Sequence, residues 1–198
     1  MMSNRQMNNV LIDTAKTTDA IALILKLHQK PTILSQLLKM MYFIDRLYLA
    51  HANKSLTNDS YLCRKGGLIP KHIPDLILQL QLREIVAVSQ IGAGYIVLNR
   101  DRGTNNLNIL EQNIIKCIYE KKSQINPFNL LDWQYDLEFI KNHLKQHHNN
   151  PISPKDIMIS LGKTEADIQA YIQSRSRIKG DFGSLGNDWQ NDTVLSQF

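Results

Sequence analysis

The three histidines His143, His147 and His148 have the spacing in this sequence that best suits a metal site. His143 and His147 lie four residues apart, so a helix would bring them onto one face, where a pair of imidazoles can bind zinc. The intervening residues include no Glu that could serve as a metalloprotease base, and spacing identifies no third ligand. We interpret the histidines as part of a solvated helix face and predict no metal site.

The patterns that would indicate covalent or cofactor chemistry are equally incomplete. Cys63 precedes Arg64 and Lys65, whose charges could lower the pKa of its thiol, whereas Cys117 falls on an apolar stripe and is interpreted as a core residue. The Gly-Ala-Gly at 92–94 lies between two β-rich runs and not between a strand and a helix, so it does not indicate a dinucleotide site. We expect a protein that is not an enzyme and has no cofactor.

Length and charge suit one globular domain with short appendages. The 198 residues carry a formal net charge of +5, a mild basic excess that fits nucleic acid or an acidic protein partner. The two cysteines form no disulfide framework. The N-terminus lacks the features of a signal peptide, and no apolar run reaches the roughly 18 residues of a membrane span. We therefore expect a cytoplasmic protein with no membrane partner.

Periodicity and turn residues predict a mainly α fold with some β structure (α+β): a compact helical domain with one inserted β-hairpin, in the order of a winged helix. The expected helices cover 19–29, 32–53, 74–84, 109–121, part of 126–148, a stretch that starts at the Ser-Pro of 153–154 and ends at 162, and 163–178. The hairpin lies within 85–100, and a short extended piece covers 61–63. The candidate N-caps are Thr17 or Thr18, Thr32 or Ser35, and Thr164. Residues 1–17 are expected to be a flexible lead, 18–179 the domain, and 180–198 a tail that is flexible or docks onto a partner.

The helix expected at 32–53 is apolar on nearly all sides, which is typical of a helix at the centre of a fold. The adjacent charges of Asp45 and Arg46 interrupt it. A buried charge without a partner is costly, and successive helix residues point about 100° apart. We predict that Asp45 faces inward and accepts hydrogen bonds from backbone amides or a basic group of the 57–67 loop, while Arg46 lies toward the edge.

The region from 39 to 78 resembles the Panacea domain, the SocA-like antitoxin family that also occurs in phage-associated proteins. The matching residues are those at 39–43, the pair Asp45 and Arg46, the loop at 56–59, the turn containing Gly66, Gly67 and Pro70, and the helix start at 73–76. Weaker likeness extends to about residue 172. Gly67 replaces the proline that usually follows the glycine of this turn, which removes a fixed φ and permits positive φ.

The resemblance implies an antitoxin that neutralises a cognate toxin, encoded next to it, by direct protein contact. Residues expected to contact a partner are Tyr61, Arg64, Lys65, Lys71, Arg100 and Arg102, together with Phe182, Trp189 and Phe198 in the tail. Aromatic and arginine side chains are favoured here because they dominate the energetics of interfaces. Two alternatives remain open at this point: a winged-helix regulator that binds DNA through its basic residues, and an adaptor that delivers a partner to a protease.

Overall fold

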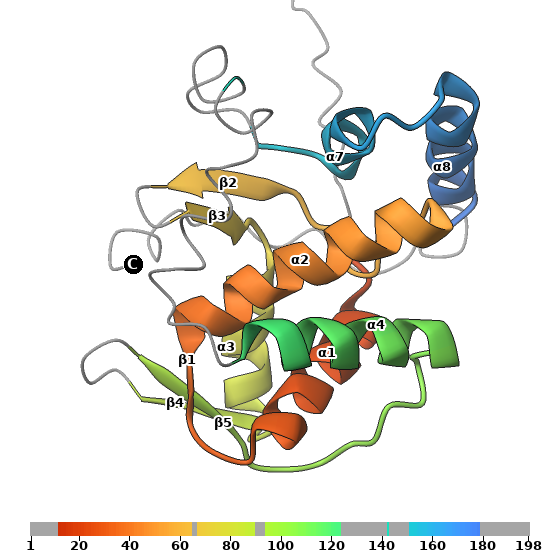
Figure 1. Ribbon diagram of the computed structural model, residues 1–198. Helices are drawn as coiled ribbons and strands as arrows, with labels where there is room; N and C mark the ends of the chain where they lie inside the picture. Colours follow the sequence, from red (N-terminus) through yellow and green to blue (C-terminus); the bar gives the residue numbers. More distant parts are fainter. Residues whose placement is uncertain (1–11, 65–66, 90–93, 124–141, 143–150, 179–198) are drawn as a thin grey trace, which may run out of the picture.

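The computed structural model describes residues 12–64, 67–89, 94–123, 142 and 151–178, and the described part is mainly helical with two small antiparallel sheets (Figure 1). This confirms the predicted fold class. In chain order the elements are α1 (Thr14–His28), β1 (Thr32–Ile33), α2 (Leu34–Ala52), β2 (Tyr61–Arg64), β3 (Gly67–Pro70), α3 (Ile73–Leu82), β4 (Val86–Ser89), β5 (Tyr95–Leu98), α4 (Ile109–Lys122), α7 (Pro154–Ser160) and α8 (Glu165–Ile178).

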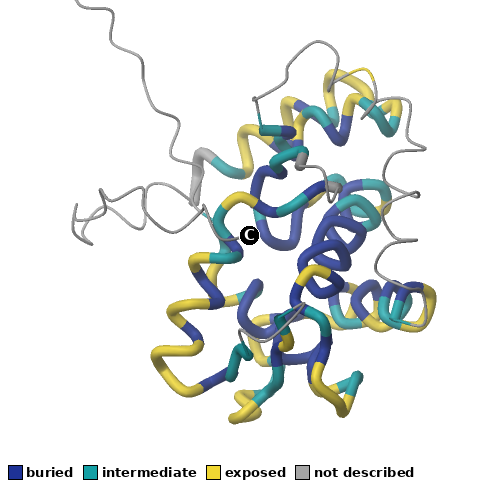
Figure 2. The backbone as a smooth tube through the Cα atoms, turned by 90° about the vertical axis from the view of Figure 1, so that its left-hand side faces the viewer, coloured by how far each residue is buried: buried dark blue, intermediate teal, exposed yellow. Residues whose placement is uncertain are grey.

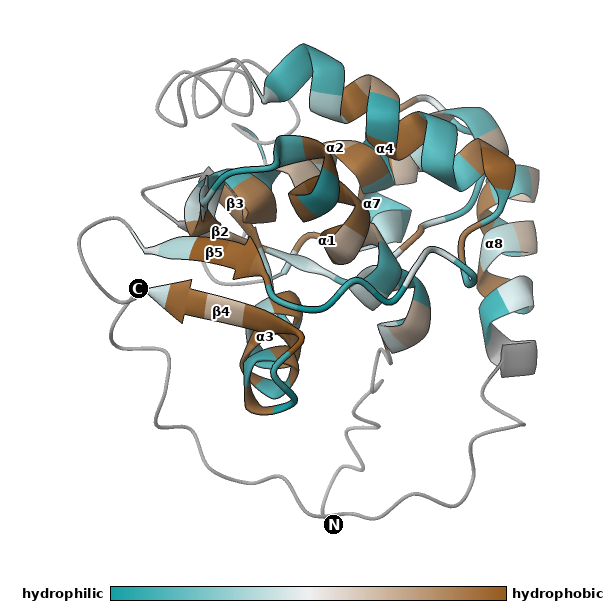
Figure 3. Ribbon diagram, turned by 90° about the horizontal axis from the view of Figure 1, so that it is seen from below, coloured by the Kyte–Doolittle hydropathy of each residue, from teal (hydrophilic) through white to brown (hydrophobic). Residues whose placement is uncertain are grey.

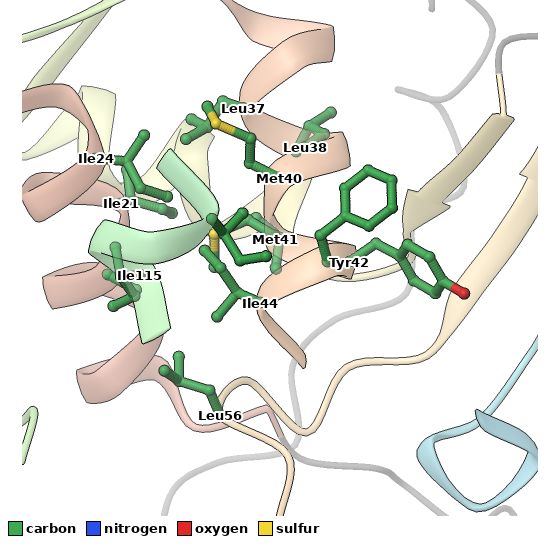
Figure 4. Packing of buried hydrophobic residues seen from close by; sticks show 14 of the residues in the cluster. Ile21, Ile24, Leu37, Leu38, Met40, Met41, Tyr42, Ile44, Leu56 and Ile115 are labelled. Carbon is green, nitrogen blue, oxygen red and sulfur yellow. The ribbon is translucent and has the colours of Figure 1, made fainter. Parts of the chain in front are cut away.

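Helix α2 is the central element, as its apolar sequence predicted. It packs against α4, the β2–β3 hairpin and α7, and α1 lies against α4 as well (Figure 1). Side chains of α1, α2 and α4 converge in one hydrophobic core, where Ile21, Met41 and Ile115 are completely buried (Figure 4). Buried residues accordingly gather along the middle of the molecule, and the exposed residues lie on the outer turns (Figure 2).

Two helices begin at other positions than the sequence suggested. Helix α1 starts at Thr14, and the carboxylate of Asp13 accepts a hydrogen bond from the amide of Lys16 at 3.0 Å. The expected caps Thr17 and Thr18 are buried inside this helix, so residues 14–17 do not belong to a flexible lead. An Asp that satisfies a first-turn amide is a favourable N-cap, and Asp13 lies about one turn upstream of the predicted caps Thr17 and Thr18.

Helix α2 follows strand β1 directly, so neither Thr32 nor Ser35 caps it. Its N-cap position is Ile33, which makes no side-chain capping bond. The amide of Leu34 instead donates to the carbonyl of Gly94 at 2.9 Å, so a backbone group of the neighbouring hairpin satisfies it. The third predicted cap is confirmed, because the amide of Asp167 donates to the hydroxyl of Thr164 at 3.2 Å.

The described residues form two hairpins, not one. The predicted hairpin is β4–β5, and β1 adds to it as a third strand in the order β1-β5-β4. The second hairpin pairs β2 with β3, from Tyr61 opposite Pro70 to Arg64 opposite Gly67. Only a single extended piece was predicted there, because four-residue strands become recognisable mainly through the partner with which they pair. The β2–β3 hairpin is inserted between α2 and α3. These are the second and third helices of the helix–helix–helix–hairpin order, which ends in the β4–β5 hairpin.

Several predictions fall on residues that the structure does not describe: the lead up to residue 11, the helix within 126–148 with its three histidines (apart from residue 142), and the tail at 180–198. Within the described residues, no helix combines the length and apolarity that crossing a membrane requires.

Two leucines near the ends of helices provide a matched test of this packing. Leu49 of α2 is completely buried, whereas Leu82 of α3 is 86% exposed. We expect Leu49→Ala to lower the free energy of unfolding by about 2–5 kcal/mol, because it removes buried methyl groups and leaves a cavity. Leu82→Ala should change it by less than about 0.5 kcal/mol. Urea denaturation of both variants measures the difference, and equal effects would contradict the placement of α2 at the centre.

Candidate functional site

The carboxylate of Asp45 is completely buried and accepts four hydrogen bonds, three from the loop after α2 and one from the first residue of β2. One oxygen accepts the backbone amides of Leu56 at 2.7 Å and Thr57 at 3.0 Å. The other accepts the hydroxyl of Tyr61 at 2.6 Å and a short hydrogen bond from the hydroxyl of Thr57. Asp45 therefore faces inward, as predicted, and its partners are amides and hydroxyls and not a basic group.

Burial raises the pKa of Asp45, because removal from water disfavours the charged form, and the hydrogen bonds from Thr57 and Tyr61 oppose this shift. The same surroundings raise the pKa of Tyr61 well above its ordinary value, first through burial and then through the neighbouring Asp45 charge. Tyr61 thus remains a neutral donor to the carboxylate. The cluster has no exposed face, so it is suited to positioning the chain and not to reacting with a ligand.

A second buried carboxylate, Asp59, lies on the same loop and fixes the start of helix α3. Its oxygens accept the amides of His72 at 2.9 Å and Ile73 at 3.0 Å, and the imidazole Nδ1 of His72 lies 2.7 Å away. The first turn of α3 has no capping bond from its own N-cap residue, His72. Asp59 supplies that acceptor from the loop, and its charge also complements the N-terminal end of the helix dipole. Asp45 thus binds the loop through hydrogen bonds, and Asp59 of that loop binds the first turn of α3 in the same way.

The neighbouring charge, Arg46, contacts helix α7. Its guanidinium donates to the hydroxyl of Ser160 in α7 at 3.2 Å, which agrees with the predicted placement toward the edge. The ammonium of Lys163 donates to the carbonyl of Ala50 at 2.6 Å, and Asn53 donates to Asp167 of α8 at 2.7 Å. The end of α2 is thereby joined to α7 and α8.

The predicted contact residues divide into buried and exposed positions. Tyr61 is completely buried, and this corrects its proposed role: it belongs to the Asp45 cluster and not to a partner surface. Pro70 is buried opposite it at the end of β3. Lys71, Arg100 and Arg102 are exposed.

The remaining predicted positions are only partly described. Arg64 and Gly67 pair across the β2–β3 hairpin. The other predicted contacts, Lys65, Phe182, Trp189 and Phe198, lie outside the described residues, as does the predicted turn residue Gly66.

The charges of Arg64 and Lys65 could have lowered the pKa of the Cys63 thiol, although the sequence did not lead us to predict catalysis at this residue. Cys63 is partly buried on β2, and burial raises its pKa, so the thiol stays protonated and is a poor nucleophile. Among the described residues, no three side chains of His, Cys, Asp or Glu come together as a potential metal site.

Sequence reasoning missed an exposed apolar stripe on α3. The side chains of Leu78 and Leu82 are 39% and 86% exposed, and both belong to the run "LILQLQL". Leucines in that run occupy opposite sides of a helix, a pattern that could have indicated a helix with a second apolar face.

Removal of the Asp45 carboxylate should destabilise the fold. Asp45→Ala leaves the buried amides of Leu56 and Thr57 without an acceptor, and each unsatisfied group costs about 1–3 kcal/mol. Asp45→Asn keeps one carbonyl acceptor and should cost less. Urea denaturation at pH 7 gives both values. An Asp45→Ala variant as stable as the wild type would contradict the positioning role.

The raised pKa of Asp45 also predicts a pH dependence of stability. In the window between the unfolded value of about 3.9 and the higher folded pKa, the folded state binds more protons at this site than the unfolded state, so this contribution to stability falls as pH rises. Asp45→Asn lacks that contribution. The stability difference between wild type and Asp45→Asn should therefore shrink as pH increases from 4 to 7, and urea titrations at several pH values measure it. A difference that grows with pH would mean that the folded pKa is depressed.

Comparison with known proteins yields one family match. Residues 37–139, just over half of the chain, match the model of the SocA-like antitoxin family with a Panacea domain. Neither the curated proteins nor the solved structures include a significant match. The matched region contains most of α2, including Asp45, together with the loop that this carboxylate binds, both hairpins, α3 and α4. Membership supports an antitoxin-type role, and the chain belongs to the SocA-like antitoxin family that carries the Panacea domain.

Proposed function

We propose that this protein is the antitoxin of a toxin–antitoxin pair, and that it neutralises its cognate toxin in the cytoplasm by direct protein contact and not through a catalysed reaction. Family membership supplies the class of function. The observation that favours a protein partner over DNA is the composition of the exposed face of α3.

Helix α3 is the third helix of the helix–helix–helix–hairpin order, the place of the DNA-reading helix in a winged helix. The exposed residues at helical spacing are Asp75, Leu78, Gln79 and Leu82. None of these four is basic, and an acidic residue lies in the first turn. A surface that approaches phosphates needs cations, whereas exposed leucines are suited to a protein interface.

A second candidate function, DNA binding, has one specific observation in its favour. Strand β1 pairs with β5 beside β4, so the sheet has the arrangement of a winged helix, and Lys71, Arg100 and Arg102 are exposed. Such cations could contact phosphates, yet Arg100 and Arg102 follow β5 and lie at the end of the hairpin away from its turn. The function of an antitoxin and that of a DNA-binding repressor could both reside in one chain, but they would use different surfaces.

Coexpression with the product of the neighbouring gene tests the main proposal. We expect that product to stop growth when expressed alone, and growth to recover when this protein is made with it. The purified pair should form a stoichiometric complex in size-exclusion chromatography with light scattering. A neighbour that is harmless alone, or that remains lethal in the presence of this protein, contradicts the proposal.

The same purified protein also tests the second candidate function, DNA binding. Binding to DNA that covers the promoter of the gene pair should weaken steeply between 50 and 200 mM salt if several phosphates are contacted. Tight, salt-dependent DNA binding without any complex with the neighbouring product would favour a regulator over an antitoxin.

A further inference from the structure

Helix α3 carries apolar residues on two opposite sides. Ile73, Leu76, Ile77 and Leu80 are buried at the spacing i, i+3, i+4 and i+7 and attach the helix to the core. Leu78 and Leu82 lie four residues apart on the exposed side, so their side chains are neighbours on one face. Figure 3 shows the hydrophobic residues of α3 next to those of the β4–β5 hairpin. Core packing therefore leaves one apolar stripe of this helix uncovered within the described part of the chain.

Basic side chains border this stripe at the C-terminal end of the helix. The guanidinium of Arg100 donates to the carbonyl of Arg83, the C-cap residue of α3, at 3.3 Å. The amides of Asn99 and Arg100 donate to the carbonyl of Ile85 at 3.0 and 3.2 Å, which holds the segment after β5 against the end of α3. Arg83 and Arg100 are both exposed.

Nearby acidic groups reduce this positive charge without cancelling it. Glu84 is exposed next to Arg83. Asp101 lies 2.6 Å from the ammonium of Lys26 and is therefore already paired, and Arg102 adds a further exposed cation. Asp75 lies at the other end of the helix, in its first turn. The exposed cations Arg83, Arg100 and Arg102 therefore lie near the C-terminal end of α3, whereas the exposed Asp75 lies in its first turn.

We propose that Leu78, Leu82, Arg83 and Arg100, which we call the α3 patch, bind an acidic amphipathic segment of the toxin; this rests on the proposed antitoxin function. Apolar side chains of that segment cover the two leucines, and its carboxylates face the two arginines. Charge complementarity favours this occupant, because a basic or purely apolar segment would leave the arginines unpaired at the edge of the interface. An amphipathic segment on an apolar stripe is also a common mode of peptide recognition.

The patch is held in place at both ends before any partner arrives. Asp59 binds the first turn of α3 through the amides of His72 and Ile73, and Arg100 binds the last turn. A surface that is already ordered loses less conformational entropy on binding. The buried Asp45 and Asp59 carboxylates therefore contribute to toxin binding indirectly, by orienting the helix that carries the contact residues.

Matched substitutions test the apolar part of the patch. Leu82→Gln removes an 86% exposed leucine, and Ile109→Gln removes a 78% exposed isoleucine at the start of α4. Both variants should keep the stability of the wild type. In titrations with the purified product of the neighbouring gene, Leu82→Gln should raise Kd tenfold or more, as expected for an interface anchor, and Ile109→Gln less than twofold.

A second pair of variants tests the contribution of the two arginines of the α3 patch. The double variant Arg83→Gln/Arg100→Gln should weaken binding at 50 mM salt and lose part of the difference in Kd between 50 and 200 mM, because screening acts on the charges that were removed. Lys155→Gln, which removes an exposed charge on α7, should leave both values unchanged. Thermal melts of the double variant check that the loss of the Arg100 hydrogen bond has not unfolded α3.

The results distinguish a failure of the proposed α3 patch from a failure of the proposed antitoxin function. If the wild type binds and neutralises the toxin while Leu82→Gln and the double variant bind equally well, the α3 patch is wrong and the antitoxin function stands. If the wild type does not bind the neighbouring product at all, both are wrong. Light scattering that shows a dimer of this protein, dissociated by Leu82→Gln, would make the patch a contact between two copies and would overturn its assignment to the toxin.

Discussion

The buried carboxylate of Asp45 is the interaction on which the arrangement of this domain depends. It lies on the central helix α2 and accepts hydrogen bonds from two amides and two hydroxyls of the segment 56–61, which comprises a loop and the first residue of β2. A buried charge that lacked these partners would cost several kcal/mol. Because the partners come from one loop, satisfaction of the carboxylate also determines the path of the chain that leads to β2, and Tyr61 then joins that hairpin to the core.

A series of polar contacts extends from this point to the surface. Asp59, on the loop that Asp45 holds, caps the start of α3, and Arg100 contacts its end. A buried carboxylate also fixes the start of α4. Glu111 accepts hydrogen bonds from the amide of Asn108 at 2.8 Å, the hydroxyl of Tyr48 at 3.0 Å and the ammonium of Lys16 at 2.5 Å. Carboxylates in the described part of the chain thus join loops and helix ends to the hydrophobic core, which gives these buried acidic residues a structural role.

The C-terminal helices α7 and α8 lie beyond the matched family region, which ends at residue 139. They contact the same central structure through Arg46 and Ser160, through Asn53 and Asp167, and through a bridge between Tyr61 and Ile152. Tyr171 of α8 is buried, and burial raises its pKa to about 12, so it stays neutral beside the Asp45 cluster. The described C-terminal helices therefore complete the environment of the family motif instead of forming a separate unit.

The amino-acid sequence was sufficient to predict the mainly helical class, the central position of α2, the β4–β5 hairpin and the inward orientation of Asp45. The first three follow from periodicity among residues close together in the chain. The orientation of Asp45 follows from its position in an apolar helix, because a charge there needs buried polar partners. The tertiary structure decided which partners Asp45 has, that Tyr61 is a core residue, that β1 and the β2–β3 hairpin exist, and that one face of α3 remains uncovered. Each of these depends on contacts between segments far apart in sequence: a strand of two residues is defined by the strand with which it pairs, and a leucine is exposed only if no other element packs over it.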